Sequence, residues 1–313
     1  MDKVIILMAT WQGEKFLQEQ IDSILAQDYI NLQLIVQDDA SKDSTLKILS
    51  SYAERFPDKV IVYENIKNIG ATKNFFHLLS VSEAENKDKH VYYMFSDQDD
   101  IWYSDKVSKT LQHIKRMEKK YGKDVPLLVF TDSEVVDSYG ERLADSFCRQ
   151  QHYNVKNRGF AHLLMENICQ GCTMMWNKSL AEKIKIPNEG ARYHDWWIAL
   201  TAAAFGKISF LPQATMQYRQ HGNNVVGADC FKKYVQQRMK NRKEQKTSLA
   251  ATFRQAEAFR VCYKEELKKQ NQQLLQKFCS IPKQGALARR KMVVDCGFYK
   301  SGLARNLGLF LNL

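Results

Sequence analysis

The chain has 313 residues, of which 44% are hydrophobic and 26% charged, and its formal net charge is +11. These proportions are those of a globular protein and exclude a chain that is disordered throughout. No stretch reaches the roughly eighteen uncharged apolar residues of a membrane-spanning helix, so we expect neither a bilayer crossing nor a secretion signal.

The first half of the chain alternates short apolar runs with segments of helical periodicity. Strands are predicted at 4–9, 32–36, 60–63 and 91–95, and helices at 14–27, 45–55, 71–84 and 104–119. This alternation predicts an α/β fold with right-handed crossovers and a mostly parallel sheet that carries helices on both faces. Ligands bind such sheets at the carboxyl ends of the strands, where the polar loops 10–13, 38–44 and 97–100 should converge.

The second half is less regular and ends in a basic region. Strands are predicted at 127–130, 172–176 and 214–218, and a helix at 193–205. From residue 231 onward there are 19 Lys and Arg against 5 Asp and Glu, whereas the first 230 residues carry a net charge of −3. We therefore predict two regions, a catalytic domain over 1–226 and a basic helical region over 227–313.

Three carboxylates follow the apolar strand at 91–95. Asp97, Asp99 and Asp100 lie so close in sequence that they should repel one another unless a cation neutralises them. Oxygen ligands on a short loop suit Mg²⁺ or Mn²⁺. The alternative is a solvated turn with a helix cap, for which Asp is also common.

Seven cysteines stand at irregular spacing, which favours a reducing compartment over a disulfide scaffold. Cys169 and Cys172 form the single C-x-x-C motif, and without a second pair or a neighbouring His they do not predict a zinc site.

The motifs of the chain, taken in order, resemble those of a known family. They are ATWQGEKFLQEQIDSIL (9–25), VQDDASKDST (36–45), NIGATKNF (68–75), FSDQDDIW (95–102), QGCTMMWN (170–177), HDWW (194–197) and YRQHGNN (218–224). The set is similar to the family 2 glycosyltransferases with the GT-A fold. Within these it resembles the bacterial rhamnosyltransferases that extend rhamnose-containing cell-wall polysaccharides and O-antigens. The resemblance covers residues 3–226 and implies a Rossmann-like sheet. The composition beyond residue 231 predicts a C-terminal helical extension.

A nucleotide-sugar site is implied by this resemblance. Asp39 resembles the carboxylate that recognises the pyrimidine base, with Asp38 beside it and Thr10 and Gln12 on the first loop. Lys73 resembles a basic residue of the donor site. The alternatives are a helix-capping loop for Asp39 and a solvated lysine at a helix start for Lys73.

The resemblance also implies a metal site and a catalytic base. Asp97 and Asp99 match the metal-binding D-x-D, with Asp99 as direct ligand and Asp97 also able to contact ribose, and His221 resembles a late residue that closes on the metal or pyrophosphate. The alternative for His221 is a structural role near a strand end.

Asp195 matches the position of the catalytic base, which would take the proton of the acceptor hydroxyl. Trp196 and Trp197 would offer an aromatic face to the acceptor sugar, and Gln170 lies where family members contact donor or acceptor. The alternative is an N-cap aspartate followed by core tryptophans.

The implied reaction is an inverting, metal-dependent transfer, with L-rhamnose passing from dTDP-β-L-rhamnose to a lipid-linked saccharide in cell-surface polysaccharide synthesis. Alternatives are another hexose from a UDP-sugar, or an inactive relative that binds sugar nucleotides.

Two apolar stripes at helical spacing mark the basic region. One stripe is Leu249, Phe253, Ala256, Phe259, Tyr263 and Leu267, and the other is Met292, Cys296, Tyr299, Leu303, Leu307 and Phe310. The second stripe has the composition of an interfacial helix on an anionic membrane, which would place the protein in the cytoplasm at the inner face of the cell membrane. The alternative is packing on the catalytic domain or in a homo-oligomer. The acidic loops argue against nucleic acid as partner.

Overall fold

The computed structural model describes residues 2–85, 90–221 and 242–313. The chain divides into two compact units, of which unit 1 comprises residues 1–147, 169–183 and 206–227 and unit 2 comprises residues 148–168, 184–205 and 228–313. Unit 2 thus takes in two segments from the middle of the chain in addition to the C-terminal helices. The predicted domain boundary at 226/227, like residues 222–224 of the last motif, lies outside the described residues.

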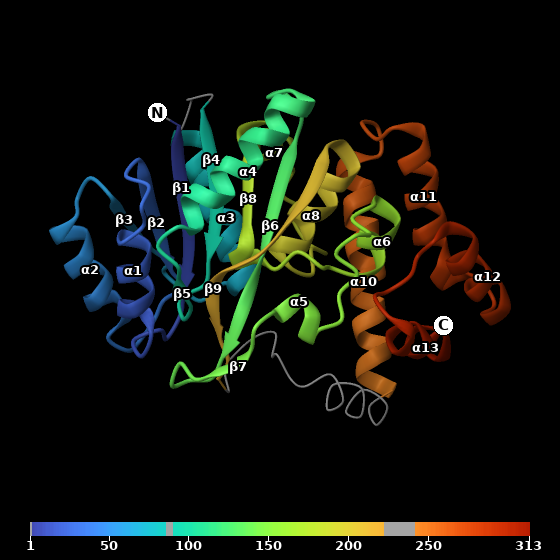
Figure 1. Cartoon of the computed structure of the whole chain (residues 1–313). Coiled ribbons are helices and arrows are strands. Elements are labelled where there is room, and N and C mark those ends of the chain that lie inside the picture. Colours follow the sequence, from blue (N-terminus) through green and yellow to red (C-terminus); the bar gives the residue numbers. More distant parts are fainter. Residues whose placement is uncertain (1, 86–89, 222–241) are drawn as a thin grey trace. The chain divides into compact units, whose positions relative to one another are not determined.

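Unit 1 contains one sheet, which has nine strands in the described part of the chain (Figure 1). The strands are β1 (Lys3–Thr10), β2 (Leu32–Asp38), β3 (Val60–Glu64), β4 (Val91–Ser96), β5 (Ile101–Trp102), β6 (Leu127–Val136), β7 (Arg142–Ala144), β8 (Met174–Asn177) and β9 (Lys207–Arg219). Their order is β3-β2-β1-β4-β8-β6-β9-β5, and β7 pairs with β6.

The pairing of β1, β2, β3 and β4 is parallel throughout, as predicted. The apolar residues of β1 and β4 are buried on both faces, as expected of central parallel strands covered by helices. The register sets Thr10 opposite Asp38 and Met8 opposite Ser96, so the loops that follow β1, β2 and β4 leave the sheet at the same edge.

The other half of the sheet combines parallel and antiparallel pairs, whereas the sequence predicted mostly parallel strands. β8 runs antiparallel to both β4 and β6, whereas β6 and β9 are parallel. Cys172 lies in a 3₁₀ turn, η1 (Gly171–Thr173), just before β8, so the prediction that the strand begins at this cysteine was two residues early.

Helices pack on this sheet. Those of unit 1 are α1 (Leu17–Leu25), α2 (Thr45–Arg55), α3 (Ala71–Glu85), α4 (Lys106–Tyr121) and α7 (Lys178–Lys183), while α5 (Phe147–Gln150) runs across the unit boundary. The four predicted helices of the first half correspond to α1, α2, α3 and α4, which follow the strands in the expected alternation.

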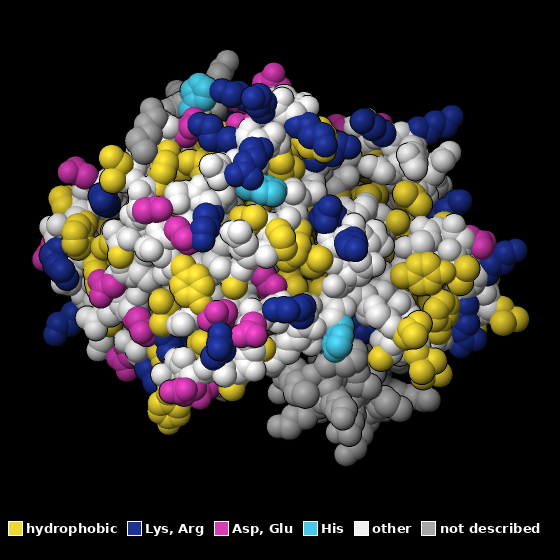
Figure 2. Space-filling model, in the orientation of Figure 1, with side chains coloured by type: hydrophobic (Ala, Val, Ile, Leu, Met, Phe, Trp, Pro, Cys, Tyr) yellow, Lys and Arg dark blue, Asp and Glu magenta, His cyan; other side chains and the backbone are white. Residues whose placement is uncertain are grey.

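Unit 2 is helical in the residues described. Its helices are α6 (Phe160–Met165), α8 (His194–Phe205), α10 (Arg242–Tyr263), α11 (Lys269–Ser280), η2 (Ile281–Lys283), α12 (Ala286–Cys296) and α13 (Leu303–Asn312). Trp197 of α8 packs against Phe259 and Tyr263 of α10, so the first predicted stripe lies in the core of this unit. Figure 2 shows that apolar side chains nevertheless remain at the surface over the C-terminal helices. Among the described helices, none is both long and apolar enough to span a membrane.

Candidate nucleotide and metal site

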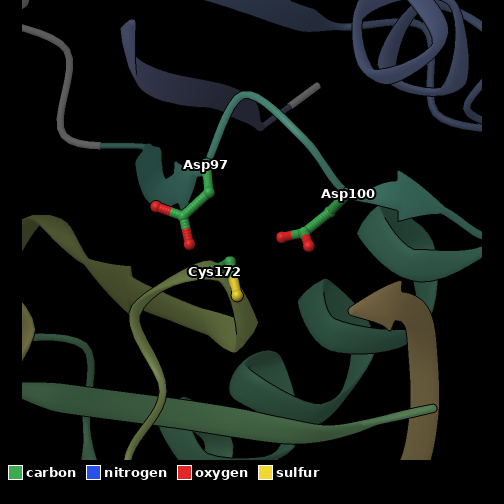
Figure 3. A group of neighbouring side chains, drawn as sticks. All are labelled: Asp97, Asp100 and Cys172. Atoms are coloured by element: carbon green, nitrogen blue, oxygen red, sulfur yellow. The ribbon is translucent and has the colours of Figure 1, made fainter. Parts of the chain in front are cut away.

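The loop after β4 gathers acidic side chains at the ligand-binding edge of the sheet. Asp97, Asp100 and Cys172 each offer one ligand atom, and these atoms lie within 4.8 Å of one another. Figure 3 shows the two carboxylates and the thiol turned toward the same space. Asp100 is fully buried, and its Oδ2 has no hydrogen-bond partner among the residues that the structure describes. Burial, followed by repulsion from Asp99 and Asp97, raises the pKa of the Asp100 carboxyl well above its usual range.

Asp99 lies beside a histidine that is remote in sequence. Oδ2 of Asp99 is 2.6 Å from Nε2 of His221, and both side chains are mostly buried. The His221 ring stacks on Phe16 with 5.1 Å between centroids, which fixes the plane of the imidazole. The structure therefore brings together two of the residues that the sequence predicted as metal ligands.

Arg219, which the sequence analysis did not single out, ties β9 to the acidic loop. Its backbone N–H donates to Asp100 Oδ1 at 3.1 Å, and its Nε donates to the backbone oxygen of Asp99 at 2.9 Å. The buried guanidinium also pairs with Glu19 and lies over the Phe16 ring. Arg219 thus holds the loop by its backbone and side chain together and supplies positive charge next to the carboxylates.

Gln98 fastens the same loop to the end of β1. Its Oε1 accepts the backbone N–H of Trp11 at 2.8 Å, and its Nε2 donates to the backbone oxygen of Trp11 at 3.0 Å. Gly13 permits this contact, because a Cβ at that position would lie 2.4 Å from Gln98 Oε1. The contact between Gln98 and the Trp11 backbone therefore depends on the absence of a side chain at residue 13.

The predicted nucleotide-binding residues on the first two loops form a connected hydrogen-bond network. Thr10 Oγ1 donates to Asp38 Oδ1 at 2.8 Å, and the Gln12 side-chain oxygen accepts the backbone N–H of Lys42 at 2.6 Å. Asp38 also accepts the N–H and hydroxyl of Ser41, so it is engaged in shaping its own loop.

Asp39 is almost completely buried and accepts three hydrogen bonds. Its Oδ1 accepts from Asn65 Nδ2 and the N–H of Ile69, and its Oδ2 accepts from the N–H of Gly70, all at 2.8 Å. Since a carboxylate oxygen has two lone pairs, Oδ2 keeps capacity for one further donor. Asp39 orders the loop before α3, whose first turn carries the exposed side chain of Lys73.

Gln170 lies next to β6 in unit 1. Its Oε1 accepts from the Ser133 hydroxyl at 3.2 Å, and its buried Nε2 has no hydrogen-bond partner within residues 2–85, 90–221 and 242–313. The neighbouring Asp132 carboxylate accepts from Ser146 Oγ at 2.5 Å.

The three remaining predicted residues lie in unit 2. Asp195 stands in the first turn of α8 and is partly exposed, and its Oδ1 accepts the N–H of Trp196 at 2.6 Å. Both tryptophans are buried: Trp196 donates its indole N–H to the oxygen of Leu163, and Trp197 donates to that of Lys185. Rings packed in this way offer no face to a sugar, so the structure favours the core role over the expected acceptor contact.

The donor set of the acidic loop fits a hard divalent cation. The structure gathers the carboxylates of Asp97 and Asp100 beside Cys172, and it holds Asp99 against His221 as a separate pair. Carboxylate oxygens suit Mg²⁺ or Mn²⁺, and an imidazole nitrogen also suits Mn²⁺. Burial raises the pKa of the Cys172 thiol well above its usual range, so that side chain remains a neutral thiol and a poor ligand for either ion.

Comparisons with known proteins identify the family to which this chain belongs. Residues 5–183 match the family described as glycosyl transferase family 2. The dTDP-rhamnosyl transferase RfbG of Shigella flexneri is 29% identical over 231 residues, covering 71% of this chain and 74% of that protein. An uncharacterized glycosyltransferase of Rickettsia prowazekii is 24% identical over 222 residues, covering 70% and 64%.

Solved structures share the GT-A fold. S. aureus TarS 1–349 in complex with UDP aligns with a TM-score of 0.53 and 16% identity, over 94% of this chain and 88% of that one. The mannosyltransferase PcManGT from Pyrobaculum calidifontis in complex with GDP-Man and Mn²⁺ aligns with a TM-score of 0.55 and 15% identity, over 95% and 73%. The family match covers more than half of the sequence and includes the acidic loop, so the chain belongs to glycosyl transferase family 2.

Proposed function

We propose that this glycosyltransferase moves L-rhamnose from dTDP-β-L-rhamnose to a hydroxyl of a lipid-linked saccharide, with inversion, in cell-surface polysaccharide synthesis. The relative named as a dTDP-rhamnosyl transferase supports this choice of donor. The observation that carries the proposal is the acidic loop after β4, with Asp99 held against His221. A departing nucleoside diphosphate needs positive charge beside it, and this loop supplies cation ligands at the edge of the sheet where ligands bind.

The proposed cofactor is Mn²⁺ or Mg²⁺, held by Asp97, Asp99 and His221. When bound, the cation acts as a Lewis acid that neutralises charge on the pyrophosphate. Arg219, whose guanidinium lies against the backbone of Asp99, keeps the loop in place while the donor binds.

The nucleotide is proposed to bind along the first two loops. The spare lone pair on Asp39 Oδ2 can accept the N–H of a pyrimidine base, while Asp38, Thr10 and Gln12 hold the loops that frame it. The exposed ammonium group of Lys73, in the first turn of α3, is proposed to meet phosphate.

Asp195 is proposed as the general base. The acceptor oxygen forms a bond to the anomeric carbon as the bond from that carbon to the phosphate oxygen breaks. The acceptor proton passes to the Asp195 carboxylate, and the nucleoside diphosphate leaves with the bonding electrons. One displacement at this carbon inverts its configuration and converts a β-linked donor into an α-rhamnoside.

A lipid-linked acceptor implies that the protein works at a membrane surface. We propose a cytoplasmic protein that is peripheral at the inner face of the cell membrane.

The test is a transfer assay with purified protein, Mn²⁺ or Mg²⁺, a saccharide acceptor, and either dTDP-rhamnose or UDP-GlcNAc as donor. Wild type should transfer rhamnose, and Asp195→Asn should lower the turnover number by about 10² to 10⁴, the usual contribution of a general base. Because Asp195 acts on the acceptor proton, the variant should keep the dissociation constant for dTDP-rhamnose. Glu189→Gln, which removes an exposed carboxylate of the same unit, is the matched control and should act as wild type.

Three outcomes would contradict parts of the proposal. Substantial transfer by Asp195→Asn would remove that residue from the base role. Binding and turnover of UDP-GlcNAc in place of dTDP-rhamnose would establish the other donor class. Donor binding without hydrolysis or transfer under any condition would identify a relative that only binds sugar nucleotides.

A further inference from the structure

The last 33 residues carry an unusual share of exposed apolar surface. Five of the thirteen large apolar side chains that are exposed in the described part of the chain lie in this segment. They are Leu287 (82% exposed), Val294 (52%), Leu303 (91%), Leu307 (63%) and Leu311 (55%). Single exposed apolar residues are common on protein surfaces, whereas several on one face of a helix are typical of a contact site.

Three of these side chains form one face of α13. Residues 303, 307 and 311 follow one another at four-residue spacing and therefore share a stripe along the helix. The opposite stripe, Arg305 and Leu309, is buried within unit 2. α13 thus packs one face, with Arg305 and Leu309, inside unit 2 and leaves a face of three leucines exposed.

The orientation of α13 is fixed by specific contacts, so the exposed stripe is not a frayed end. Arg305 pairs with Glu166 and lies over the Tyr153 ring at 5.0 Å. From α12, Arg290 Nε donates to the Phe310 oxygen at 3.0 Å, and Arg289 Nη1 donates to the Leu313 oxygen at 3.3 Å. These bonds satisfy carbonyl groups that the end of a helix leaves unpaired.

α12 continues the same kind of surface and adds charge. Leu287, Lys291 and Val294 share one side of that helix at spacings of four and three residues, and all three are exposed. Residues 281–313 contain six Lys and Arg against a single Asp. Of the basic residues, Lys283 and Lys291 are exposed, whereas Arg305 is buried and paired with Glu166. Figure 2 shows apolar side chains gathered over these helices with basic side chains beside them.

We propose that the exposed faces of α12 and α13 dock on an anionic lipid surface, with Leu303, Leu307 and Leu311 entering the boundary between headgroups and acyl chains. Short amphipathic helices bind in this way when leucines face the acyl region and lysines face anionic headgroups. A second copy of the chain fits less well, because a symmetric dimer would set this positively charged face against itself. The proposal locates the peripheral attachment of the proposed function, and it is tested without any sugar transfer.

The test is co-sedimentation of the full chain with vesicles of phosphatidylcholine alone or with about one third phosphatidylglycerol. Wild type should bind the anionic vesicles, and raised salt should weaken that binding because the electrostatic part is screened. Leu303→Gln/Leu307→Gln should lower the bound fraction about tenfold or more, and Lys283→Gln/Lys291→Gln should remove the preference for anionic lipid. Ile30→Gln/Val261→Gln, which exchanges two similarly exposed apolar residues elsewhere, is the matched control and should bind as wild type.

Circular dichroism and light scattering complete the design. Each variant should keep the wild-type helical signal, since the exchanged side chains are exposed. The proposal would be overturned if Leu303→Gln/Leu307→Gln bound vesicles as well as wild type does, or if wild type did not bind vesicles at all. The proposal would also be overturned if wild type formed a dimer, the leucine variant stayed monomeric and neither bound vesicles. That result would assign the exposed face to a second copy of the chain. Rhamnose transfer that persists alongside either result would leave the proposed sugar transfer standing, while the proposed attachment to the membrane through this face would be wrong.

Discussion

Lys106 is a buried basic residue close to the acidic loop. Its side chain is fully buried in unit 1, where Nζ lies 3.2 Å from Thr215 Oγ1 and 3.5 Å from Met216 Sδ, and the Trp102 ring is 4.7 Å away. Burial lowers the pKa of this lysine to about 8, against the opposing effects of Cys172 and Asp100. A buried ammonium without close ion pairing makes the folded state sensitive to pH.

The direction of this sensitivity follows from proton binding. Between pH 8 and 10.5 an unfolded lysine keeps its proton while Lys106 in the fold has released it, so this residue adds stability as the pH rises through that window. At 1.36 kcal/mol per pKa unit the gain is about 3 kcal/mol. We expect the free energy of unfolding of wild type to rise by that amount relative to Lys106→Met between pH 7.5 and 10.5.

Urea unfolding of both proteins at four pH values in this window measures the difference. Lys119→Met, which exchanges an exposed lysine of the same helix, should run parallel to wild type. If the free energy of unfolding of Lys106→Met also changed with pH in parallel with that of wild type, Lys106 would titrate as an ordinary lysine.

The sequence indicated the carboxylates of this region but not the residues that hold them. Asp97 and Asp99 stand out because three acids follow an apolar strand. Arg219 and Lys106 carry no such signal, since a basic residue near the end of a strand or the start of a helix is usually solvated. Their burial depends on how β5 and β9 pair, which no local pattern encodes.

At the scale of elements, the acidic loop depends on a close approach between two segments. Gly13, after β1, leaves room for the Gln98 side chain that bonds both backbone groups of Trp11. Gly13→Ala would place a Cβ 2.4 Å from Gln98 Oε1 and must displace the end of that side chain. Because only a flexible amide has to move, the fold should persist while the loop loses its attachment.

We therefore expect Gly13→Ala to weaken cation-dependent nucleotide binding by up to about thirtyfold, the equivalent of two lost hydrogen bonds worth roughly 1 kcal/mol each. Gln98→Ala should have a similar effect, and the double variant should add little to either single one, since all three remove the same contact. Gly285→Ala, at a position with open space and ordinary backbone angles, is the control. Calorimetry with dTDP and Mn²⁺ measures each variant, and wild-type affinity in Gly13→Ala would contradict this role for the glycine.

The elements that the sequence predicted well are those with local signals. β1, β2, β3 and β4 are apolar runs bounded by polar loops, and the helices between them are amphipathic. The antiparallel direction of β8 was missed because it follows from the irregular path of residues 137–173. The second predicted stripe was wrong as a single helix face, because Gly297 at φ +71° ends α12 and α13 begins at Leu303.

At the scale of the whole molecule, a sheet that collects ligand-binding loops at one edge is combined with a helical unit that carries Asp195 and the exposed faces of α12 and α13. Family membership fixes the general chemistry, whereas the proposals for donor, acceptor and membrane contact depend on individual side chains. The alternation of strands and helices made the fold of unit 1 predictable. The make-up of unit 2 was not, because it draws on three separate stretches of the chain.

The acidic loop after β4 is proposed to bind a divalent cation through which the protein holds a nucleoside diphosphate. Titration calorimetry of dTDP tests it on wild type with Mn²⁺, on wild type with EDTA, and on Asp99→Asn with Mn²⁺. Asp58→Asn, at an exposed position of unit 1, serves as control. We expect removal of the cation and loss of the Asp99 charge each to weaken binding by about tenfold or more, as is usual when the surroundings of a bound metal are altered. Equal affinity for dTDP with and without the cation would contradict the claim.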